Sequence, residues 1–351
     1  MIAPIRVALL GYGLAGAVFH APLIAAVDGL ELVAIVTRDE ERRSRARREH
    51  PDAELLSSPE EVWERAADLD LVVVAAVNRA HVPLARSSIE AGLAVVVDKP
   101  IAASAEEGLA LVLEARKRGV LLTVFQNRRW DGDFLTLRGL LAEGDLGEVA
   151  RFESRFERWR PELSAGWRES GDPQDAGGLP YDLGSHLVDQ ALFLFGPAVQ
   201  VYAELDGRRA GAQTDDDTFV ALEHESGARS HLWMSAVAAQ AGPRFRVLGS
   251  RAAYVKYGLD VQEEQLRSGR RPSDPGWGRE PEDRWGTLGS GDRLERVPTV
   301  GGAYQRFYEG VLVALCEGAP PPVDPEAVVA GLEVLDAARA SARERRLVEL
   351  R

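Results

Sequence analysis

Apolar and polar positions follow two different patterns along this chain, and the change falls near residue 125. Before it, short apolar runs are separated by amphipathic segments. The expected strands are 5–10, 30–36, 71–77, 94–97 and 120–125. The expected helices are 15–27, one that follows the cap Ser58 and starts at Pro59, one that starts at His81, and one from 105 to 118 capped by Ser104. Strand–helix alternation of this kind predicts a parallel, doubly wound α/β sheet.

After residue 125 the strand-like runs follow one another without helices between them. They are 149–159 (with the alternation of an exposed strand), 199–205, 218–224, 229–234, 244–248 and 252–256. Helices are expected at 133–143, 181–195, 304–316 and 325–342, and the Gly- and Pro-rich segment 272–298 is expected to be a long ordered loop. This succession predicts an α+β domain with an open, mostly antiparallel sheet, so that we expect two domains, 1–125 and 126–351.

The first strand leads into a glycine-rich turn of the form G-x-G-x-x-G, which is followed by a helix. Its residues are Gly11, Tyr12, Gly13, Leu14, Ala15 and Gly16. Between a strand and a helix, such glycines permit a tight turn and let the backbone approach a pyrophosphate at the helix N-terminus. Residues 1–125 are therefore predicted to form a dinucleotide-binding domain of the Rossmann type.

The residues after the second strand bear on which dinucleotide is bound. NAD-binding domains usually place Asp or Glu there, against the ribose hydroxyl, whereas this chain has Thr37 and Arg38. A hydroxyl and a guanidinium suit a 2′-phosphate, because arginine presents two parallel donors. We expect NADP(H) to be preferred. In the alternative interpretation Asp39 takes the acidic role, Arg38 stays on the surface, and NAD(H) is used.

Two further strand ends carry polar side chains. Asn78 follows the run 71–77 and His81 opens the next helix. Both are candidate cofactor contacts, and the alternative for Asn78 is a polar turn residue.

The run 94–97 ends in Asp98-Lys99-Pro100, at the sheet edge where open α/β sheets bind ligands. Lys99 is one of only three lysines among 42 Lys and Arg. The pKa of a lysine can shift with its environment, whereas arginine stays protonated, so Lys99 is a candidate catalytic residue. The alternative is that Lys99 is a solvated lysine in a loop.

In the second half, the segment 181–186 (Tyr-Asp-Leu-Gly-Ser-His) opens an expected helix. Asp182 and His186 are four residues apart and would share one helix face. Histidine exchanges a proton near neutral pH and a carboxylate can orient it, although a purely structural pair is the alternative. The preceding Gly177 and Gly178 allow a close backbone approach at the helix entry. No Cys/His cluster has metal-ligand spacing, so we expect no metal site.

Composition narrows the classes of partner. A formal net charge of −13 and a pI of about 5.1 oppose nonspecific binding to nucleic acid or to an anionic membrane. The arginine-rich segment 41–50 lies among acidic residues and is expected to be a solvated helix face. The single cysteine, Cys316, excludes an internal disulfide and is expected in the core. With no signal-peptide layout and no apolar run long enough to span a bilayer, we expect a soluble, cytoplasmic protein.

Together, the glycine loop, Asp98-Lys99-Pro100 and the segment 177–186 resemble the Gfo/Idh/MocA family of NAD(P)-dependent oxidoreductases, over nearly the whole chain. Within that family the chain is similar to the NADP-dependent scyllo-inositol dehydrogenase group. That similarity is carried by the glycine loop with Phe19-His20-Ala21-Pro22, by Asn127-Arg128-Arg129-Trp130-Asp131 and by Trp167-Arg168.

The resemblance implies an NADP(H)-dependent dehydrogenase that acts on a secondary alcohol of an inositol, another cyclic polyol or a sugar. His186 would take the hydroxyl proton, Lys99 would polarise the same oxygen, and Asp182 would position the substrate hydroxyls and the other two groups. Substrate contacts from Arg128, Trp167 and Arg168 are implied, with Asp98 and Lys99 beside the cofactor. Residues 126–351 would bind substrate and form contacts in a homodimer or homotetramer.

The chain departs from the family pattern at two places. Asp98 stands where glutamate is usual, and Ala75-Ala76-Val77-Asn78 replaces a common Thr-Pro-Asn strand end, which bears on the roles of Asn78 and His81. Two other functions of the same fold remain open at this stage: a redox-silent NADP-binding regulator, and cofactor-assisted cleavage of a glycoside.

Overall fold

The computed structural model describes residues 3–164 and 166–350. The chain divides into two compact units. The first comprises the described parts of Met1–Asn127, Gln262–Trp277 and Ala303–Val329, and the second those of Arg128–Val261, Gly278–Gly302 and Ala330–Arg351. The chain therefore returns to the first unit twice after residue 261, rather than dividing at a single point.

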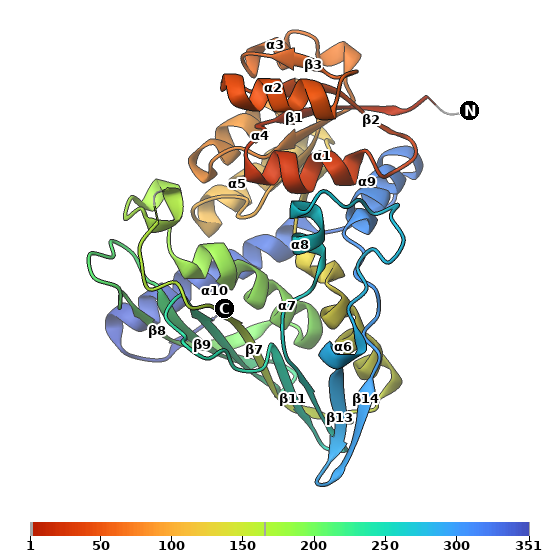
Figure 1. Cartoon of the computed structure of the whole chain (residues 1–351). Helices are drawn as coiled ribbons and strands as arrows, with labels where there is room; N and C mark the ends of the chain where they lie inside the picture. The colour runs from red at the N-terminus through yellow and green to blue at the C-terminus, as the bar shows by residue number, and fades with distance from the viewer. Residues whose placement is uncertain (1–2, 165, 351) are drawn as a thin grey trace. The chain divides into compact units, whose positions relative to one another are not determined.

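The first unit contains a parallel sheet (Figure 1), as the alternation of strands and helices predicts, but the sheet has six strands, one more than the five expected. Its strands are β1 (Ile5–Leu10), β2 (Leu30–Val36), β3 (Glu54–Leu56), β4 (Leu71–Val74), β5 (Ala94–Val97) and β6 (Leu122–Val124), in the order β3-β2-β1-β4-β5-β6. Every residue of β4 and β5 is buried, which is typical of parallel strands covered on both faces. The strand expected at 71–77 ends earlier, at Val74.

The helices of the first unit largely follow the predicted segments. They are α1 (Ala21–Ile24), α2 (Glu40–Glu49), α3 (Glu60–Trp63), α4 (His81–Glu90), α5 (Ala105–Arg118), α8 (Gln262–Arg267) and α9 (Gln305–Glu317), with a π-helical turn η1 (Ala15–His20) before α1. The predicted cap of α5 is confirmed, because the Ser104 hydroxyl accepts the N–H of Glu107 at 3.3 Å.

Three local predictions in the first unit are wrong. The helix expected over 15–27 begins as a π-helical turn and ends at Ile24. Ser58 does not cap α3, because the N-cap of that helix is Pro59. The backbone N–H of Ser58 instead donates to Glu61 Oε1 at 2.9 Å. Cys316, expected in the core, is exposed on the last turn of α9, because the apolar face of that helix turns away from it.

The second unit contains a nine-stranded sheet that is mixed and mostly antiparallel, as predicted. Its strands are β7 (Val149–Glu157), β8 (Ala198–Asp206), β9 (Asp217–His224), β10 (Arg229–Ser235), β11 (Phe245–Gly249), β12 (Ala253–Lys256), β13 (Gly286–Ser290), β14 (Arg293–Val297) and β15 (Val348–Glu349). The order is β14-β13-β12-β11-β7-β10-β9-β8-β15, and β7 and β10 pair in parallel. Part of the segment expected to be a loop, 272–298, is therefore the hairpin β13–β14.

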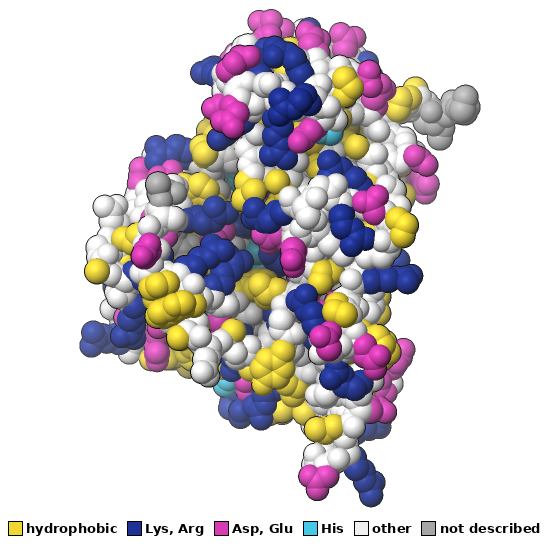
Figure 2. Space-filling view, in the orientation of Figure 1, with side chains coloured by type: hydrophobic (Ala, Val, Ile, Leu, Met, Phe, Trp, Pro, Cys, Tyr) yellow, Lys and Arg dark blue, Asp and Glu magenta, His cyan; other side chains and the backbone are white. Residues whose placement is uncertain are grey.

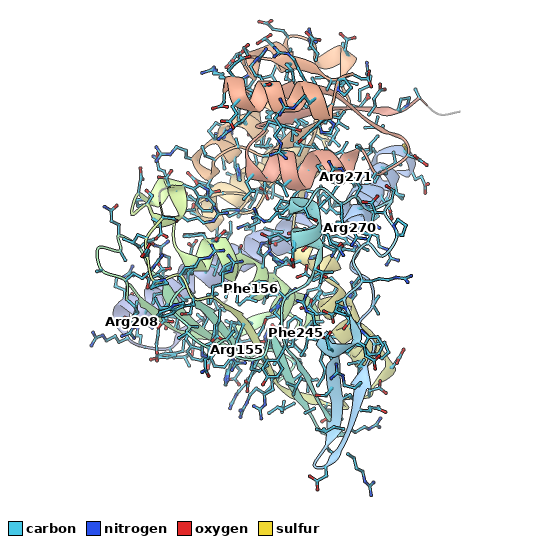
Figure 3. All side chains as sticks on the ribbon, viewed as in Figure 1. Arg155, Phe156, Arg208, Phe245, Arg270 and Arg271 are labelled. Atoms are coloured by element: carbon cyan, nitrogen blue, oxygen red, sulfur yellow. The ribbon has the colours of Figure 1, made fainter. Side chains whose placement is uncertain are left out.

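The strand expected to be exposed, β7, lies inside this sheet between β10 and β11. Arg155 and Phe156, both labelled in Figure 3, show how side chains alternate along it. Phe156 is fully buried, whereas the guanidinium carbon of Arg155 lies 3.9 Å from the ring centroid of Trp233 on the other face. The helices of this unit are α6 (Gly132–Glu143), α7 (Ser185–Phe195) and α10 (Pro325–Glu344), which begins in the first unit.

The surface is charged but mixed in sign. On the face drawn in Figure 2, Lys and Arg side chains are interspersed with Asp and Glu. Over the described residues, every helix is too short or too polar to cross a membrane.

Candidate functional site

The carboxyl ends of the parallel strands form one row across the first unit. Val36, Leu10, Val74 and Val97 are consecutive register partners on β2, β1, β4 and β5. The predicted cofactor residues come directly after this row. Because β1 and β4 are neighbours on which the order of strands reverses, this edge is the topological switch point where open α/β sheets bind ligands.

Two glycines of the turn after β1 are required by close backbone packing. Gly11 has φ of +104°, and a Cβ there would lie 2.5 Å from the carbonyl oxygen of Ala75. A Cβ on Gly16 would lie 2.1 Å from the carbonyl oxygen of Gly11. At Gly13, by contrast, a Cβ would meet nothing nearer than Arg42 Nη1 at 3.6 Å. The backbone at Gly13 is therefore open on one side, as close approach of a phosphate requires.

The other members of this turn have distinct environments. Tyr12 is buried and its hydroxyl donates to Glu49 Oε2 at 2.7 Å, so its side chain ties the turn to α2. Burial, and then the bond to Glu49, raises the pKa of Tyr12. Leu14 is exposed and Ala15 is half-buried. Tyr12, Leu14 and Ala15 can therefore offer a cofactor mainly their backbone.

Three arginines surround the residues that follow β2. Thr37 is buried, and Arg38 is exposed with its Nε bonded to the Ser57 carbonyl at 3.0 Å. Arg43 binds the carbonyl oxygens of Thr37 and of two β3 residues, so its role is to hold strand ends together. Arg42 is exposed beside Gly13, which the sequence reasoning missed. Its position four residues after Arg38 was the available signal.

Asp98 and Lys99 follow β5, as predicted, and both are half-buried. The Asp98 carboxylate accepts the Lys99 backbone N–H on Oδ1 at 2.8 Å, and its Oδ2 lies 3.8 Å from His20 Nε2. Burial by itself raises the pKa of Asp98, but His20, followed by His81 and Lys99, outweighs it and lowers that pKa. Asp98 is therefore a carboxylate at neutral pH.

Asn78 and His81 lie at the end of β4. Asn78 is buried at the start of a short 3₁₀ turn (Asn78–Ala80). The His81 ring contacts two backbone carbonyl oxygens, that of Pro100 from Nδ1 at 2.7 Å and that of Ala76 from Nε2 at 3.1 Å. Burial lowers the pKa of His81, so the ring is neutral and donates to one of the two. His81 joins the ends of β4 and β5, and its ring is committed to that role.

In the second unit, Asp182 lies in a π-helical turn (Pro180–Gly184) that leads into α7. Its Oδ2 accepts Arg168 Nε at 2.9 Å, and the Arg168 guanidinium carbon lies 4.5 Å from the centroid of the Trp167 ring. Three of the predicted substrate residues thus lie together. The backbone supports this arrangement, because the Gly178 N–H donates to the Arg168 carbonyl at 3.0 Å.

The predicted role of Gly177 and Gly178 is confirmed, since both lie where a side chain would collide. A Cβ on Gly177 would lie 2.3 Å from the Ser170 carbonyl oxygen. Gly178 has φ of +91°, and its Cβ would lie 2.6 Å from Asp215 Oδ2. That carboxylate in turn accepts the Leu179 N–H at 3.1 Å.

His186 is buried in the first turn of α7, and the next turn of that helix binds the segment that carries Arg128. Gln190 Nε2 donates to the Arg128 carbonyl at 2.9 Å, and Asp189 forms two hydrogen bonds with Arg129, at 2.7 and 2.8 Å. Arg128 itself is buried, with its guanidinium carbon 4.9 Å from the Phe156 centroid. Asp189 and Gln190, three and four residues after His186, were missed by the sequence reasoning.

The predicted residues thus form two groups, one in each unit. The first holds the turn after β1, the ends of β2 and β4, and Asp98 with Lys99; the second holds Asp182, His186, Arg128, Trp167 and Arg168. Among residues 3–164 and 166–350, His, Cys, Asp and Glu side chains form no group of three that could hold a metal ion.

A parallel sheet with a glycine cradle at its switch point, followed by a domain with a mixed sheet, defines a two-domain protein with a dinucleotide-binding fold of the Rossmann type. Residues 5–126 match the NAD-binding Rossmann domain of the Gfo/Idh/MocA oxidoreductase family, and residues 138–350 match its C-terminal alpha/beta domain. The chain belongs to this family.

Individual relatives are similar over their whole lengths. The chain is 37% identical to scyllo-inositol 2-dehydrogenase (NADP(+)) IolW of Bacillus subtilis, over 99% of this chain and 96% of the relative. It is 41% identical to the uncharacterized oxidoreductase YdgJ of Escherichia coli, over 97% of each. The solved structure of the putative oxidoreductase yvaA from Bacillus subtilis superposes with a TM-score of 0.95 at 37% identity, covering 100% of this chain and 99% of that one.

Proposed function

We propose that this protein is an NADP(H)-dependent dehydrogenase that oxidises a secondary alcohol of an inositol, a related cyclic polyol or a sugar. One observation carries the proposal. A relative that matches 99% of this chain is an NADP-dependent scyllo-inositol 2-dehydrogenase, and the resemblance to its family implies that Lys99, Asp182 and His186 carry the chemistry.

In the proposed reaction the substrate carbon loses a hydride and its hydroxyl loses a proton, which leaves a carbonyl group. The bound nicotinamide supplies the hydride acceptor. His186 takes the hydroxyl proton, and the Lys99 ammonium donates a hydrogen bond to the same oxygen as negative charge develops on it. Asp182, Trp167 and Arg168, which contact one another in series, hold the remaining hydroxyls.

The donor set after β2 supports a 2′-phosphate. Thr37 and Arg38 supply a hydroxyl and an exposed guanidinium after β2, and the exposed Arg42 lies beside Gly13 of the glycine turn, which adds a second guanidinium. Asp39, the acidic alternative, accepts the Arg42 backbone N–H at 2.9 Å as the N-cap of α2, so its carboxylate already has a structural role.

The decisive test compares NADP⁺ and NAD⁺ with the purified protein across a panel of inositols, cyclic polyols and aldoses. We expect reduction of NADP⁺ with at least one member, and loss of kcat in Lys99→Met. Lys117→Met is the matched control, because Lys117 is an exposed lysine on α5. Tight NADPH binding without turnover on any member of the panel would contradict the proposal.

Cofactor choice is tested by Arg38→Ala and Arg42→Ala. Each should weaken the preference for NADP⁺ over NAD⁺ by about tenfold or more, since a hydrogen bond to a charged group contributes roughly 1.5–3 kcal/mol. Arg47→Ala is the matched control, because Arg47 is exposed on α2 and, among the described residues, its one ion-pair partner is the exposed Glu40, at 3.6 Å. An unchanged preference in Arg38→Ala and Arg42→Ala would remove the 2′-phosphate argument.

We also propose that the chain forms a homodimer or homotetramer through the nine-stranded sheet. Along β9 buried and half-exposed residues alternate, and the half-exposed face holds Phe219, His231 and Trp233 with ring centroids 5.1–5.9 Å apart. Light scattering should report an oligomer, and Trp233→Glu should shift it toward monomer because a charge would be buried at the contact. A monomeric wild type at micromolar concentration would contradict this.

A further inference from the structure

A buried line of polar groups in the first unit ends at the residue that precedes Lys99. The Tyr308 hydroxyl on α9 lies 2.6 Å from His20 Nδ1, and His20 Nε2 lies 3.8 Å from Asp98 Oδ2. Tyr308 and His20 are both fully buried. The His20 ring packs against Phe125, with centroids 4.4 Å apart, so its orientation is restricted. The sequence motif that contains His20 has no role in the reaction proposed above.

The partners of these groups determine which ring nitrogen carries the proton. Burial, and then the charge of Asp98, raises the pKa of Tyr308 well above its normal value, so the phenol is neutral. Within the described part of the chain, its hydroxyl has no acceptor other than His20 Nδ1. If Tyr308 donates to Nδ1, the proton of a neutral ring must be on Nε2, which faces the Asp98 carboxylate.

His20 Nε2 is a buried polar atom without a hydrogen-bond partner among the described residues. A buried N–H in that condition is unfavourable, and the nearest anion, Asp98 Oδ2, lies just beyond hydrogen-bond range. Hydrogen bonds of catalytic groups are often long in the absence of ligand and shorten in the working complex. The orphaned nitrogen is therefore aimed at the carboxylate it would bind.

Asp98 transmits this contact to Lys99 through its other oxygen. Oδ1 accepts the Lys99 backbone N–H at 2.8 Å, so the carboxylate faces His20 with one oxygen and is bonded to the Lys99 main chain with the other. The ionisable groups facing Asp98 are His20, His81, Lys99 and Tyr308. Aspartate at this position keeps the carboxylate one methylene nearer the strand end than the glutamate that is usual in the family.

We propose that Tyr308 and His20 are positioning residues for Lys99: Tyr308 fixes the tautomer of His20, His20 Nε2–H holds the Asp98 carboxylate, and Asp98 fixes the main chain of Lys99. The part that concerns Lys99 rests on the proposed dehydrogenase function. His20 and Tyr308 touch neither substrate nor cofactor in this scheme.

The kinetic test uses two substitutions of His20. Glutamine offers an amide donor toward Asp98 and a carbonyl acceptor toward Tyr308, whereas leucine offers neither. We expect His20→Leu and Tyr308→Phe to lower kcat roughly ten- to hundredfold at unchanged Kd for NADP⁺, and His20→Gln to recover most of kcat.

The control is Tyr254→Phe, which removes another deeply buried hydroxyl, one without a hydrogen-bond partner in the described chain. It should leave kcat unchanged. Equal kcat in His20→Leu and the wild type would overturn the proposal, as would a His20→Gln variant no better than His20→Leu.

A second measurement does not depend on activity. Nitrogen-15 NMR of the histidine-labelled protein, with His20→Gln used to assign the signal among six histidines, reports the tautomer directly. We expect a protonated Nε2 in the wild type and its loss or mixing in Tyr308→Phe. A proton on Nδ1 in the wild type would overturn the proposal. If the wild type shows the expected tautomer but oxidises no polyol or sugar, the proposed dehydrogenase function is refuted. The proposed contacts of Tyr308 with His20 and of His20 with Asp98 then still stand.

Discussion

The ion pair between Arg129 and Asp189 offers the most direct test of how the second unit holds its site together. Asp189 lies one turn after His186 on α7, and both hydrogen bonds to Arg129 are short, at 2.7 and 2.8 Å. The side chains are 10% and 5% exposed, so neither charge is solvated by water to any large extent. Replacing Asp189 by alanine leaves the Arg129 guanidinium buried without its counter-charge.

The expected cost follows from that burial. Removing one partner of a buried pair costs about 3–5 kcal/mol, because the remaining charge is uncompensated. The chain supplies a matched exposed pair in the same unit, Asp206 with Arg208 at 2.5 Å, whose side chains are 50% and 58% exposed. Exposed pairs contribute about 0–1 kcal/mol, so Asp206→Ala should change the free energy of unfolding by no more than that.

Urea unfolding followed by circular dichroism and by tryptophan fluorescence measures both variants against the wild type. Coincident transitions of the two probes are needed for a two-state free energy, since the chain has two compact units. A loss of less than about 1 kcal/mol in Asp189→Ala, equal to that in Asp206→Ala, would refute the reasoning from burial. The double variant Arg129→Met, Asp189→Leu should regain part of the loss, because it buries no charge.

Two further predictions concern the first sheet and the effect of pH. Gly16→Ala should abolish tight NADPH binding and lower the free energy of unfolding, because the new Cβ would lie 2.1 Å from the Gly11 carbonyl oxygen. Calorimetric titration measures the NADPH affinity and urea unfolding measures the stability. A normal NADPH affinity would contradict the prediction. Burial raises the pKa of Glu153, but the opposite effect of Arg155 and Arg246 is larger. The pKa of Glu153 in the folded protein therefore lies below the normal value of about 4.3. Its contribution to stability is therefore present above that value and lost as pH falls through the folded pKa, and Glu153→Gln should flatten the fall in unfolding free energy between about pH 5 and 3; an unchanged slope would contradict this.

Much of the fold could be predicted because its signals are local. Apolar runs and caps such as Ser104 depend on neighbours within one element, and the parallel order of the first sheet follows from strand–helix alternation. The wrong predictions arise where a local signal points away from the pairing found in the structure. The segment 272–298 contains many Gly and Pro residues, which indicate turns, but part of it forms β13 and β14, and β13 also pairs with the neighbouring strand β12.

The sequence predicts which residues form the candidate site, but not which partners those residues contact. In the sequence, Lys99 follows an expected strand, and Asp182 and His186 lie at the start of an expected helix. Motifs at such positions indicate functional residues. The sequence contains no signal that Arg168 binds Asp182, and the spacing of Asp182 and His186 was interpreted on a regular helix although the first part is a π-helical turn. Such contacts depend on how loops fold back on the helix entry.

The amino-acid sequence by itself determined the two-domain plan, the glycine turn and the strand that leads into Asp98 and Lys99, because side-chain periodicity and turn chemistry act over a few residues. Only the tertiary structure decided which distant groups meet. His20 and Tyr308 are 288 positions apart, and α9 belongs to the first unit although most of the second unit precedes α9 in the sequence. Packing of apolar faces brings such segments together, and the polar atoms that become buried must then find partners among whatever lies beside them.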